Sequence, residues 1–284
     1  MKLAMYRLGG RQRFGAVVPG GLVSLDDKLA GITDLAALLG SDAMPRAAAL
    51  AVETQADATI EDVSFLPLLV PGAKVLCAGL NYQAHAAEAG REKPKPDVGF
   101  FVKLPSALAA HGAPLRLPRV SDRFDFEGEL CVVIGCGGRH VRMEDALSHV
   151  AGYTILMDGS VRDYQKNSVA AGKNFDDSGA VGPWMTTADE IADPTRLSIT
   201  TRVNGAVMQQ GGVELMIHSI PKMIAYFSGI MRLSPGDLIA TGTPEGVGWH
   251  REPPVFLKAG DRVEIEIDGI GILSNPVLSE DDAR

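Results

Sequence analysis

The pattern of hydrophobic and polar residues changes along the chain near residue 70. Before it, short β-type runs joined by Gly-Gly and Asp-Asp turns precede two segments rich in alanine and leucine, which predicts two strands and then two helices. These elements are expected at 2–8, 14–24, 32–40 and 44–54. Residues 66–72 contain two prolines and a glycine, which interrupt any periodicity. We therefore predict a small N-terminal α+β domain at 1–70 and a larger domain at 71–284.

The longer part of the chain, from Lys74 onward, contains many short apolar runs separated by turn residues. Strands are expected at 74–80, 98–103, 129–135, 150–157, 197–203, 237–241 and 262–267. Helices are expected at 82–88, 143–150 and 218–229. Because the pattern has no repeated strand–helix–strand unit, it predicts a mixed α+β fold that is mostly β.

Composition and charge narrow the range of partners. The chain has 284 residues, with 27 lysines and arginines against 35 aspartates and glutamates, for a formal net charge of −8. A protein this acidic lacks the attraction for phosphate on which nucleic-acid binding depends, so we expect no nucleic-acid partner. The first fifteen residues lack the apolar stretch of a signal peptide, and no run approaches the roughly 20 apolar residues that span a bilayer. With only three cysteines, we expect a cytoplasmic protein with no membrane partner.

Candidate chemistry begins with the sequence Glu127-Gly128-Glu129. Side chains alternate faces along a strand, so both carboxylates project from the same side and repel each other unless a cation lies between them. Alone, this pair would be interpreted as an exposed strand end. A third acid, Asp158, follows the apolar run 150–157 and so lies at the end of a predicted strand. Three carboxylates without a nearby thiolate or imidazole cluster favour Mg²⁺, Mn²⁺ or Ca²⁺ over zinc.

A second candidate is the pair His85 and Glu88, which are neighbours at i and i+3 on the predicted helix 82–88. Glu88 accepting one imidazole N–H would raise the basicity of the other ring nitrogen, making His85 a general base. The alternative is a solvated surface pair. The helix is followed by Gly90 and the charged, proline-containing stretch 91–96, a combination typical of a mobile lid.

Two further segments could contact a small anionic ligand. The glycine-rich sequence 241–248 follows a predicted strand but lacks the lysine of a nucleotide-binding loop, and its backbone N–H groups and threonine hydroxyls could hold a carboxylate. Lys173 lies in a predicted turn at 172–176, where a surface lysine is the default expectation.

Taken in order, these motifs resemble the fumarylacetoacetate hydrolase family. They are G-L-N-Y-x-x-H-x-x-E, Lys103, E-G-E-L, D-x-S-x-R-D-x-Q, G-K-N-F, G-P-W, N-G and L-x-P-G-D-x-I-x-T-G-T-P-x-G-V-G, between about Lys74 and Val277. The resemblance implies a rolled or barrel-like mixed β-sheet core, a small N-terminal domain and a homodimer. It also implies the site residues: metal ligands Glu127, Glu129 and Asp158 for Mg²⁺, catalytic residues His85, Glu88 and Lys173, and substrate-binding residues Arg162, Gln165 and Thr243.

The resemblance further implies hydrolysis of a C–C bond in a 2,4-dioxo acid such as an acylpyruvate. The pair His85–Glu88 would activate water, and the metal with Lys173 would stabilise the pyruvate enolate that leaves. The same enolate chemistry serves an oxaloacetate-type decarboxylase or a 2-hydroxy-dienoate isomerase, which are alternatives on this site. A non-catalytic metabolite-binding protein is the alternative from another class, and it would be expected to lack part of this residue set.

Overall fold

The computed structural model describes residues 1–91 and 96–282. The strands are β1 (Lys2–Leu8), β2 (Arg11–Val18), β3 (Gly21–Ser24), β4 (Ser64–Phe65), β5 (Val75–Ala78), β6 (Phe100–Lys103), β7 (Leu108–Ala109), β8 (Leu115–Leu117), β9 (Phe124–Asp125), β10 (Gly128–Ile134), β11 (Val150–Met157), β12 (Ser160–Val161), β13 (Gly179–Thr187), β14 (Ser198–Val203), β15 (Ala206–Gly212), β16 (Leu238–Ala240), β17 (Arg262–Ile267) and β18 (Gly271–Ser279). The helices are α1 (Leu35–Leu39), α2 (Met44–Glu53), α3 (Gln83–Glu88), α4 (Arg162–Gln165), α5 (Val169–Lys173) and α6 (Ile220–Ile230). No helix within these ranges combines the length and the hydrophobicity that crossing a bilayer requires.

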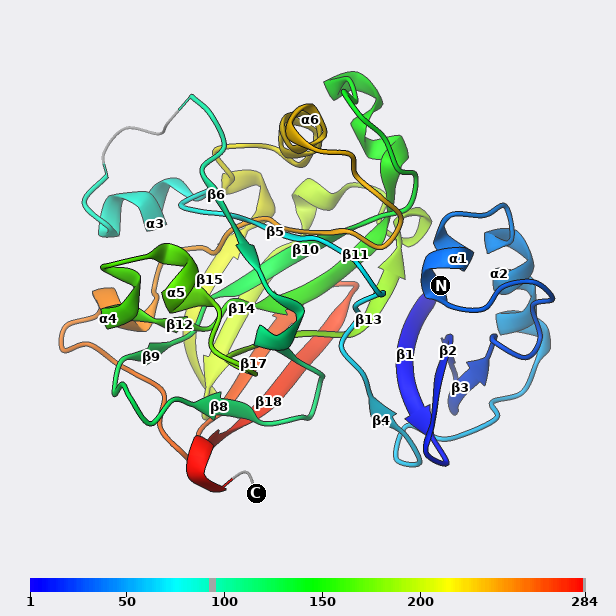
Figure 1. The fold of residues 1–284 in the computed structure, drawn as a ribbon, viewed down its shortest axis with the longest axis horizontal. Coiled ribbons are helices and arrows are strands. Elements are labelled where there is room, and N and C mark those ends of the chain that lie inside the picture. Colours follow the sequence, from blue (N-terminus) through cyan, green and yellow to red (C-terminus); the bar gives the residue numbers. More distant parts are fainter. Residues whose placement is uncertain (92–95, 283–284) are drawn as a thin grey trace.

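Two sheets make up most of the molecule (Figure 1). The larger sheet has the strand order β3-β2-β1-β13-β11-β10-β16-β5-β6, and β4 and β7 pair with β1 and β13 at its sides. The smaller sheet has the order β15-β14-β17-β18-β8. β10 and β11 are antiparallel neighbours, whereas β16 pairs in parallel with β5, so the larger sheet is mixed. The predicted α+β fold, mostly β with a small N-terminal sheet region, is confirmed.

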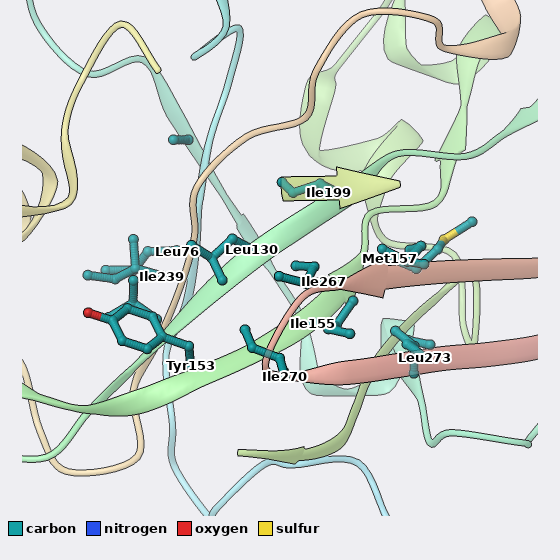
Figure 2. Close-up of a cluster of buried hydrophobic side chains, with 14 of the residues drawn as sticks. Leu76, Leu130, Tyr153, Ile155, Met157, Ile199, Ile239, Ile267, Ile270 and Leu273 are labelled. Atoms are coloured by element: carbon teal, nitrogen blue, oxygen red, sulfur yellow. The ribbon is translucent and has the colours of Figure 1, made fainter. Parts of the chain in front are cut away.

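Both faces of β10 are buried, which explains why its apolar residues follow one another instead of alternating with polar ones. Leu130 and Val132 belong to a buried cluster that also contains Ile199 of β14 and Ile267 of β17. Figure 2 shows Leu130 beside these two isoleucines, so this side of β10 packs against the smaller sheet. The intervening residue Cys131 belongs instead to the cluster shared with β5 and the N-terminal strands and helices. A strand segment that is buried on both faces, as residues 130–134 are, needs apolar side chains at successive positions.

The N-terminal segment is continuous with the larger sheet through β1. β1 pairs antiparallel with β13, with Lys2 opposite Thr186 and Leu3 opposite Met185. Buried leucines of α1 pack in the same cluster as β1 and β2. The division into domains at residue 70 stays a prediction.

Several predicted elements have different bounds or types in the structure. The expected strand 14–24 is broken at residues 19–20 into β2 and β3, because Pro19-Gly20 forms a turn there. The expected helix 143–150 is a 3₁₀ helix at Met143–His149. The expected helix 218–229 begins later, at Ile220, because the Ser219 side chain caps it by accepting the Lys222 backbone N–H.

Sequence periodicity missed three long strands, β13, β15 and β18. Each contains glycine or proline, which weakens the signal for a strand. In β13, Pro183 lies near a register irregularity against β11, where the Thr154 hydroxyl of β11 donates to the Trp184 carbonyl oxygen at 2.8 Å. A side chain thus supplies a hydrogen bond at a point where the backbone ladder is interrupted.

Candidate metal and acid–base site

Three buried carboxylates converge at one end of the β10–β11 pair. Glu127 precedes β10, Glu129 lies in it, and Asp158 follows β11 directly. The antiparallel register places Gly128 opposite Met157, and the Asp158 N–H donates to the Glu127 carbonyl oxygen at 2.8 Å. One ligand oxygen from each carboxylate lies within 4.8 Å of the others. The structure therefore brings together all three of the predicted metal ligands.

Gly128 holds the two glutamates in place through its backbone groups. Its N–H donates to the Gln209 side-chain oxygen at 3.0 Å, and its carbonyl oxygen accepts the Thr243 hydroxyl at 2.9 Å. Gln209 also donates to the Thr243 oxygen at 2.8 Å. The hydroxyl of Thr243, a predicted substrate-binding residue, is thus engaged within the protein, where it supports the metal ligands.

Two buried lysines lie against these acids. The Lys173 ammonium donates to Glu127 at 2.7 Å and to Asp158 at 2.6 Å, and the side chain is 3% exposed. Burial would lower the pKa of Lys173, but the charges of Asp158 and Glu127 outweigh it and raise this pKa. Lys103 donates to the other Asp158 oxygen at 2.8 Å and to the Lys173 carbonyl oxygen at 2.6 Å. Lys173 is therefore a buried cation and not the surface lysine that a turn would suggest.

Arg162 adds a third positive charge. Its guanidinium donates to Asp125 at 2.8 Å, to Glu127 at 2.7 Å and to the Gln165 side-chain oxygen at 3.1 Å. Burial opposes ionisation of Glu127, yet the charges of Lys173 and Arg162 hold the pKa of this carboxyl well below its usual range. Glu127 therefore stays ionised, and Arg162, a predicted substrate-binding residue, is paired with protein carboxylates.

Glu129 differs from the other acids because no described residue forms an ion pair with it. Its carboxylate accepts the Gly242 N–H at 2.8 Å. Burial, followed by repulsion from Asp158 and Glu127, raises the pKa of Glu129 well above its usual value. A divalent cation bound between the three carboxylates would offset the repulsion of Glu129 by Asp158 and Glu127. Three carboxylates also form the oxygen-rich ligand set that hard dications prefer. The residues present therefore fit a divalent metal ion.

His85 and Glu88 form a hydrogen-bonded pair on α3. His85 Nδ1 lies 2.7 Å from Glu88 Oε1, and the second Glu88 oxygen accepts the Gly246 N–H at 3.0 Å. Burial would raise the pKa of Glu88, but the hydrogen bonds from His85 and Gly246 outweigh it and lower this pKa. His85 is only 6% exposed, so the pair is not a solvated surface pair. Most of the stretch 91–96 lies outside the described residues, and lid movement stays a prediction.

The glycine-rich segment 241–248 does hold carboxylates, and they belong to the protein. The Gly242 N–H donates to Glu129 and the Gly246 N–H to Glu88. This segment therefore ties the acid cluster to the His85–Glu88 pair.

A cavity of about 500 Å³ joins these groups. Residues of α3, α4 and α5 contribute to its lining, and these three short helices lie on one side of the molecule (Figure 1). Seven of the nine predicted site residues line it: His85, Glu127, Glu129, Arg162, Gln165, Lys173 and Thr243. Asp158 and Glu88 touch the lining residues from behind. The predicted residues therefore form one site, and their individual roles stay predictions.

The sequence interpretation missed several residues of this site. Asp125 accepts hydrogen bonds from Arg162, Gly248 N and Trp249 N, and it precedes Glu127 by two residues, so extending the strand alternation by one position would have found it. Lys103 was part of the motif series without an assigned role, and its position at the end of an apolar strand is a weak signal. His218 and His250 also line the cavity, and nothing in their sequence context indicates it.

Known proteins that resemble this chain include a protein family and several curated relatives. A family model described as fumarylacetoacetate (FAA) hydrolase C-terminal matches residues 74–278. The mitochondrial oxaloacetate tautomerase of Xenopus laevis is 40% identical over 244 residues, which cover 84% of this chain and 76% of the relative. The oxaloacetate tautomerase YisK of Bacillus subtilis is 43% identical over 215 residues, covering 74% and 71%.

A solved structure resembles the whole chain. Maleylpyruvate hydrolase from Sphingobium sp. SYK-6, crystallised with manganese(II) and pyruvate, has a TM-score of 0.82 and 33% identity, covering 98% of this chain and 99% of that one.

Proposed function

The chain belongs to the fumarylacetoacetate hydrolase family, and on that basis we propose that it interconverts the keto and enol forms of oxaloacetate. Two relatives at 40% and 43% identity are oxaloacetate tautomerases. This similarity favours enolate chemistry on oxaloacetate, the substrate class of the predicted decarboxylase alternative, over the hydrolysis of a 2,4-dioxo acid that the motifs first implied.

One observation carries the proposal: Glu127 and Glu129 of the acid cluster line the same cavity as His85. A small 2-oxo acid held by its C1 carboxylate and C2 oxygen at the acids would keep its C3 protons within the same enclosed space as His85. Proton transfer at C3 is the step that keto–enol interconversion requires, and a positioned imidazole is the side chain most often used for it.

For the metal we propose Mg²⁺, with Mn²⁺ as an alternative, held by Glu127, Glu129 and Asp158. Bound there, the ion would supply Lewis-acid polarisation of the C2 oxygen. Lys103 and Lys173 orient Asp158 and Glu127 through the hydrogen bonds described above, and the charge of Lys173 lowers the pKa of Glu127.

The chain's own residues account for the proton transfers. In the keto-to-enol direction, His85 takes a proton from C3, and the electron pair of that C–H bond forms the C2–C3 double bond while negative charge develops on the C2 oxygen. Glu88 stabilises the imidazolium that results, because its ionised carboxylate lies 2.7 Å from His85 Nδ1. Lys173 places a positive charge beside the cavity, which favours that oxyanion. The enol forms when the His85 imidazolium gives this proton, directly or through a water molecule, to the C2 oxygen, which restores the neutral imidazole.

Hydrolysis of an acylpyruvate remains a second candidate because of the size of the cavity. About 500 Å³ is more than a four-carbon acid fills, and the similar maleylpyruvate hydrolase shows that this fold accommodates a longer substrate in a relative. In that reaction His85 would take a proton from water instead of from C3.

The experiment follows the ultraviolet absorbance of enol-oxaloacetate after it is mixed with metal-stripped protein, with and without added Mg²⁺ or Mn²⁺. We expect the enol to decay faster than in buffer only when metal and protein are both present, without stoichiometric release of CO₂ or pyruvate. Release of CO₂ would indicate the decarboxylase instead. Release of pyruvate from a panel of acylpyruvates, with ¹⁸O from water in the acid product, would indicate the hydrolase. Metal-dependent stabilisation with none of these activities would indicate the binding protein.

Two further predictions accompany this function. We propose the homodimer that the family resemblance implied, and light scattering of the purified chain tests it. The cytoplasmic location also stays a proposal, which fractionation of the source cells would test.

A further inference from the structure

Asp125 is a fully buried carboxylate beside the acid cluster, and neither the proposed metal binding nor the proposed proton transfer uses it. One of its oxygens accepts the Phe126 and Gly248 N–H groups, both at 2.8 Å. The other oxygen accepts the Trp249 N–H at 2.9 Å and the Arg162 guanidinium at 2.7 to 2.8 Å. All of these partners donate, which suits an ionised carboxylate, because that group only accepts hydrogen bonds. Asp125 is therefore a fixed negative charge inside the protein.

The backbone at Gly248 is shaped to approach this carboxylate. A Cβ at Gly248 would collide with the Val255 carbonyl oxygen and would lie 2.6 Å from the nearer Asp125 oxygen. Glycine thus allows the N–H groups of Gly248 and Trp249 to reach Asp125. These bonds hold the carboxylate in place independently of Arg162, so its charge would stay buried at the same position if Arg162 were replaced.

Arg162 connects Asp125 to a metal ligand. Its Nη2 nitrogen lies 2.7 Å from an Asp125 oxygen and 2.7 Å from a Glu127 oxygen. One guanidinium is therefore shared between two carboxylates, and the negative charge of Asp125 offsets part of the attraction of Arg162 for Glu127. If Asp125 were neutral, the whole charge of Arg162 would act on Glu127 and would compete there with a bound cation.

The balance of charge across the site shows what Asp125 contributes. Metal binding requires the three ligand carboxylates to be ionised, and three cations lie within hydrogen-bond distance of them. Those cations are Lys103, Lys173 and Arg162. The ligands and the cations are equal in number, so by themselves they leave no excess negative charge for a dication. Asp125 gives the buried cluster one net negative charge, which salt screens only weakly at such a depth.

We propose that Asp125 is a positioning residue of the metal site, which holds the charge of Arg162 away from Glu127 and gives the cluster the net negative charge that a divalent cation requires. Asp125 acts through Arg162 and makes no contact with the metal. The inference deepens the proposed function, and it rests on that function for the presence of the metal ion.

Titration calorimetry of the metal-stripped protein with Mg²⁺, and separately with Mn²⁺, tests this without any substrate. Asp125→Asn removes the charge and keeps the size of the side chain and one acceptor oxygen. Its Kd for Mg²⁺ should rise by about 10-fold to 100-fold, the usual effect of removing a group that supports a metal ligand. The matched control Asp122→Asn makes the same change three residues away, at a side chain that is 97% exposed, and should bind Mg²⁺ as wild type does.

Arg162→Gln should have the opposite effect, and it tests the proposal even if Asp125→Asn fails to fold. The substitution removes one positive charge, keeps an N–H donor and leaves Asp125 bonded to the Gly248 and Trp249 N–H groups. The cluster then carries two net negative charges, so Mg²⁺ should bind about 10-fold more tightly. If Arg162 served only to orient Glu127, this variant would bind Mg²⁺ more weakly than wild type.

The double variant Asp125→Asn/Arg162→Gln removes both charges and restores the net charge of the wild type. Its Kd for Mg²⁺ should return close to the wild-type value, although it lacks the same carboxylate as Asp125→Asn. A role of Asp125 confined to anchoring Gly248 and Trp249 would show no such recovery.

Three results would overturn the proposal: unchanged Mg²⁺ affinity in Asp125→Asn, an Arg162→Gln variant that binds Mg²⁺ no more tightly than wild type, or a double variant no better than Asp125→Asn. A wild-type protein that binds neither Mg²⁺ nor Mn²⁺ would disprove the proposed metal site and this inference with it. The expected order of affinities in a protein that fails to tautomerise oxaloacetate would disprove the proposed function alone.

Discussion

Replacing Glu129 by glutamine should have opposite effects on the metal-free and the metal-bound protein. Glu129 is the acid of the cluster without an ion-pair partner among the described residues, and it is 1% exposed. Glutamine keeps the size of the side chain and an oxygen that can accept the Gly242 N–H, so the substitution removes charge and little else. The metal-free protein should gain stability because a buried repulsion is lost, and metal binding should weaken because one of three carboxylates is lost.

The distances between the carboxylate oxygens give the size of the repulsion that the substitution removes. The ligand oxygens lie within 4.8 Å of one another, and at an effective dielectric constant of about 20 two like charges at that separation repel by about 3.5 kcal/mol. Glu129 faces two such neighbours, and the Lys173 ammonium bonded to both offsets about one repulsion. The unfolding entropy of 284 residues is about 0.6 kcal/mol per kelvin. The gain in the metal-free protein is therefore about 6 °C in Tm, less the part of the same repulsion that protonation of Glu129 already relieves in the wild type.

Scanning calorimetry of the metal-stripped protein measures the change in stability. The same scans repeated across a series of Mg²⁺ concentrations measure the change in metal binding. At a Mg²⁺ concentration about 100 times Kd, binding stabilises the wild type by about 2.7 kcal/mol, or about 4 to 5 °C. Glu129→Gln should lose most of this shift, and the exposed control Glu61→Gln should keep it. A lower Tm for metal-free Glu129→Gln together with a full Mg²⁺ shift would refute the reasoning.

Four further outcomes are expected. His85→Ala should reduce kcat by about 10²-fold to 10⁴-fold with the Mg²⁺ shift in Tm intact, and unchanged kcat would rule out His85 as the base. Lys173→Met leaves two buried carboxylates without this cation, which should cost about 3 to 5 kcal/mol of unfolding free energy. The Tm of the metal-free protein should therefore fall by about 5 to 8 °C, and an unchanged Tm in calorimetry would contradict the pairing. Because the folded-state pKa of Glu88 is lowered, its stabilising effect is present above the usual carboxyl pKa and is lost as pH falls through the folded value. Glu88→Gln should therefore flatten the acid side of the Tm–pH curve, and an identical curve would argue against the His85–Glu88 bond. Gly159→Ala should reduce soluble yield and Tm, because a Cβ there collides with the Ser178 carbonyl oxygen; circular dichroism melting that matches wild type would count against this close approach.

Local chemistry made part of the site predictable. Side-chain alternation along a strand identified Glu127 and Glu129 as neighbours on one side, and the apolar run before Asp158 identified a carboxylate at a strand end. The i,i+3 spacing of His85 and Glu88 predicted their hydrogen bond, which the structure contains at 2.7 Å. Each of these relations depends on residues close in sequence, where backbone geometry alone decides which side chains meet.

Other parts of the site depend on contacts between distant segments. Lys173 has the sequence context of a surface turn, and it is buried because α5 packs it against Glu127 and Asp158. Lys103 meets Asp158 across 55 residues of chain, and Asn81 holds His218 across 137. β13 was missed for a related reason, since its glycine and proline residues give no strand pattern and pairing with β1 and β11 determines its conformation.

The sequence by itself determined the mixed, mostly β fold, the acidic composition that disfavours nucleic acid, and the residue types of a divalent-metal and acid–base site. Only the tertiary structure decided which charges neutralise one another, and that Glu129 has no cationic partner within residues 1–91 and 96–282. The physical reason is that periodicity and spacing report on neighbours within one element. Burial and ion pairing depend instead on which elements the folded sheets bring together.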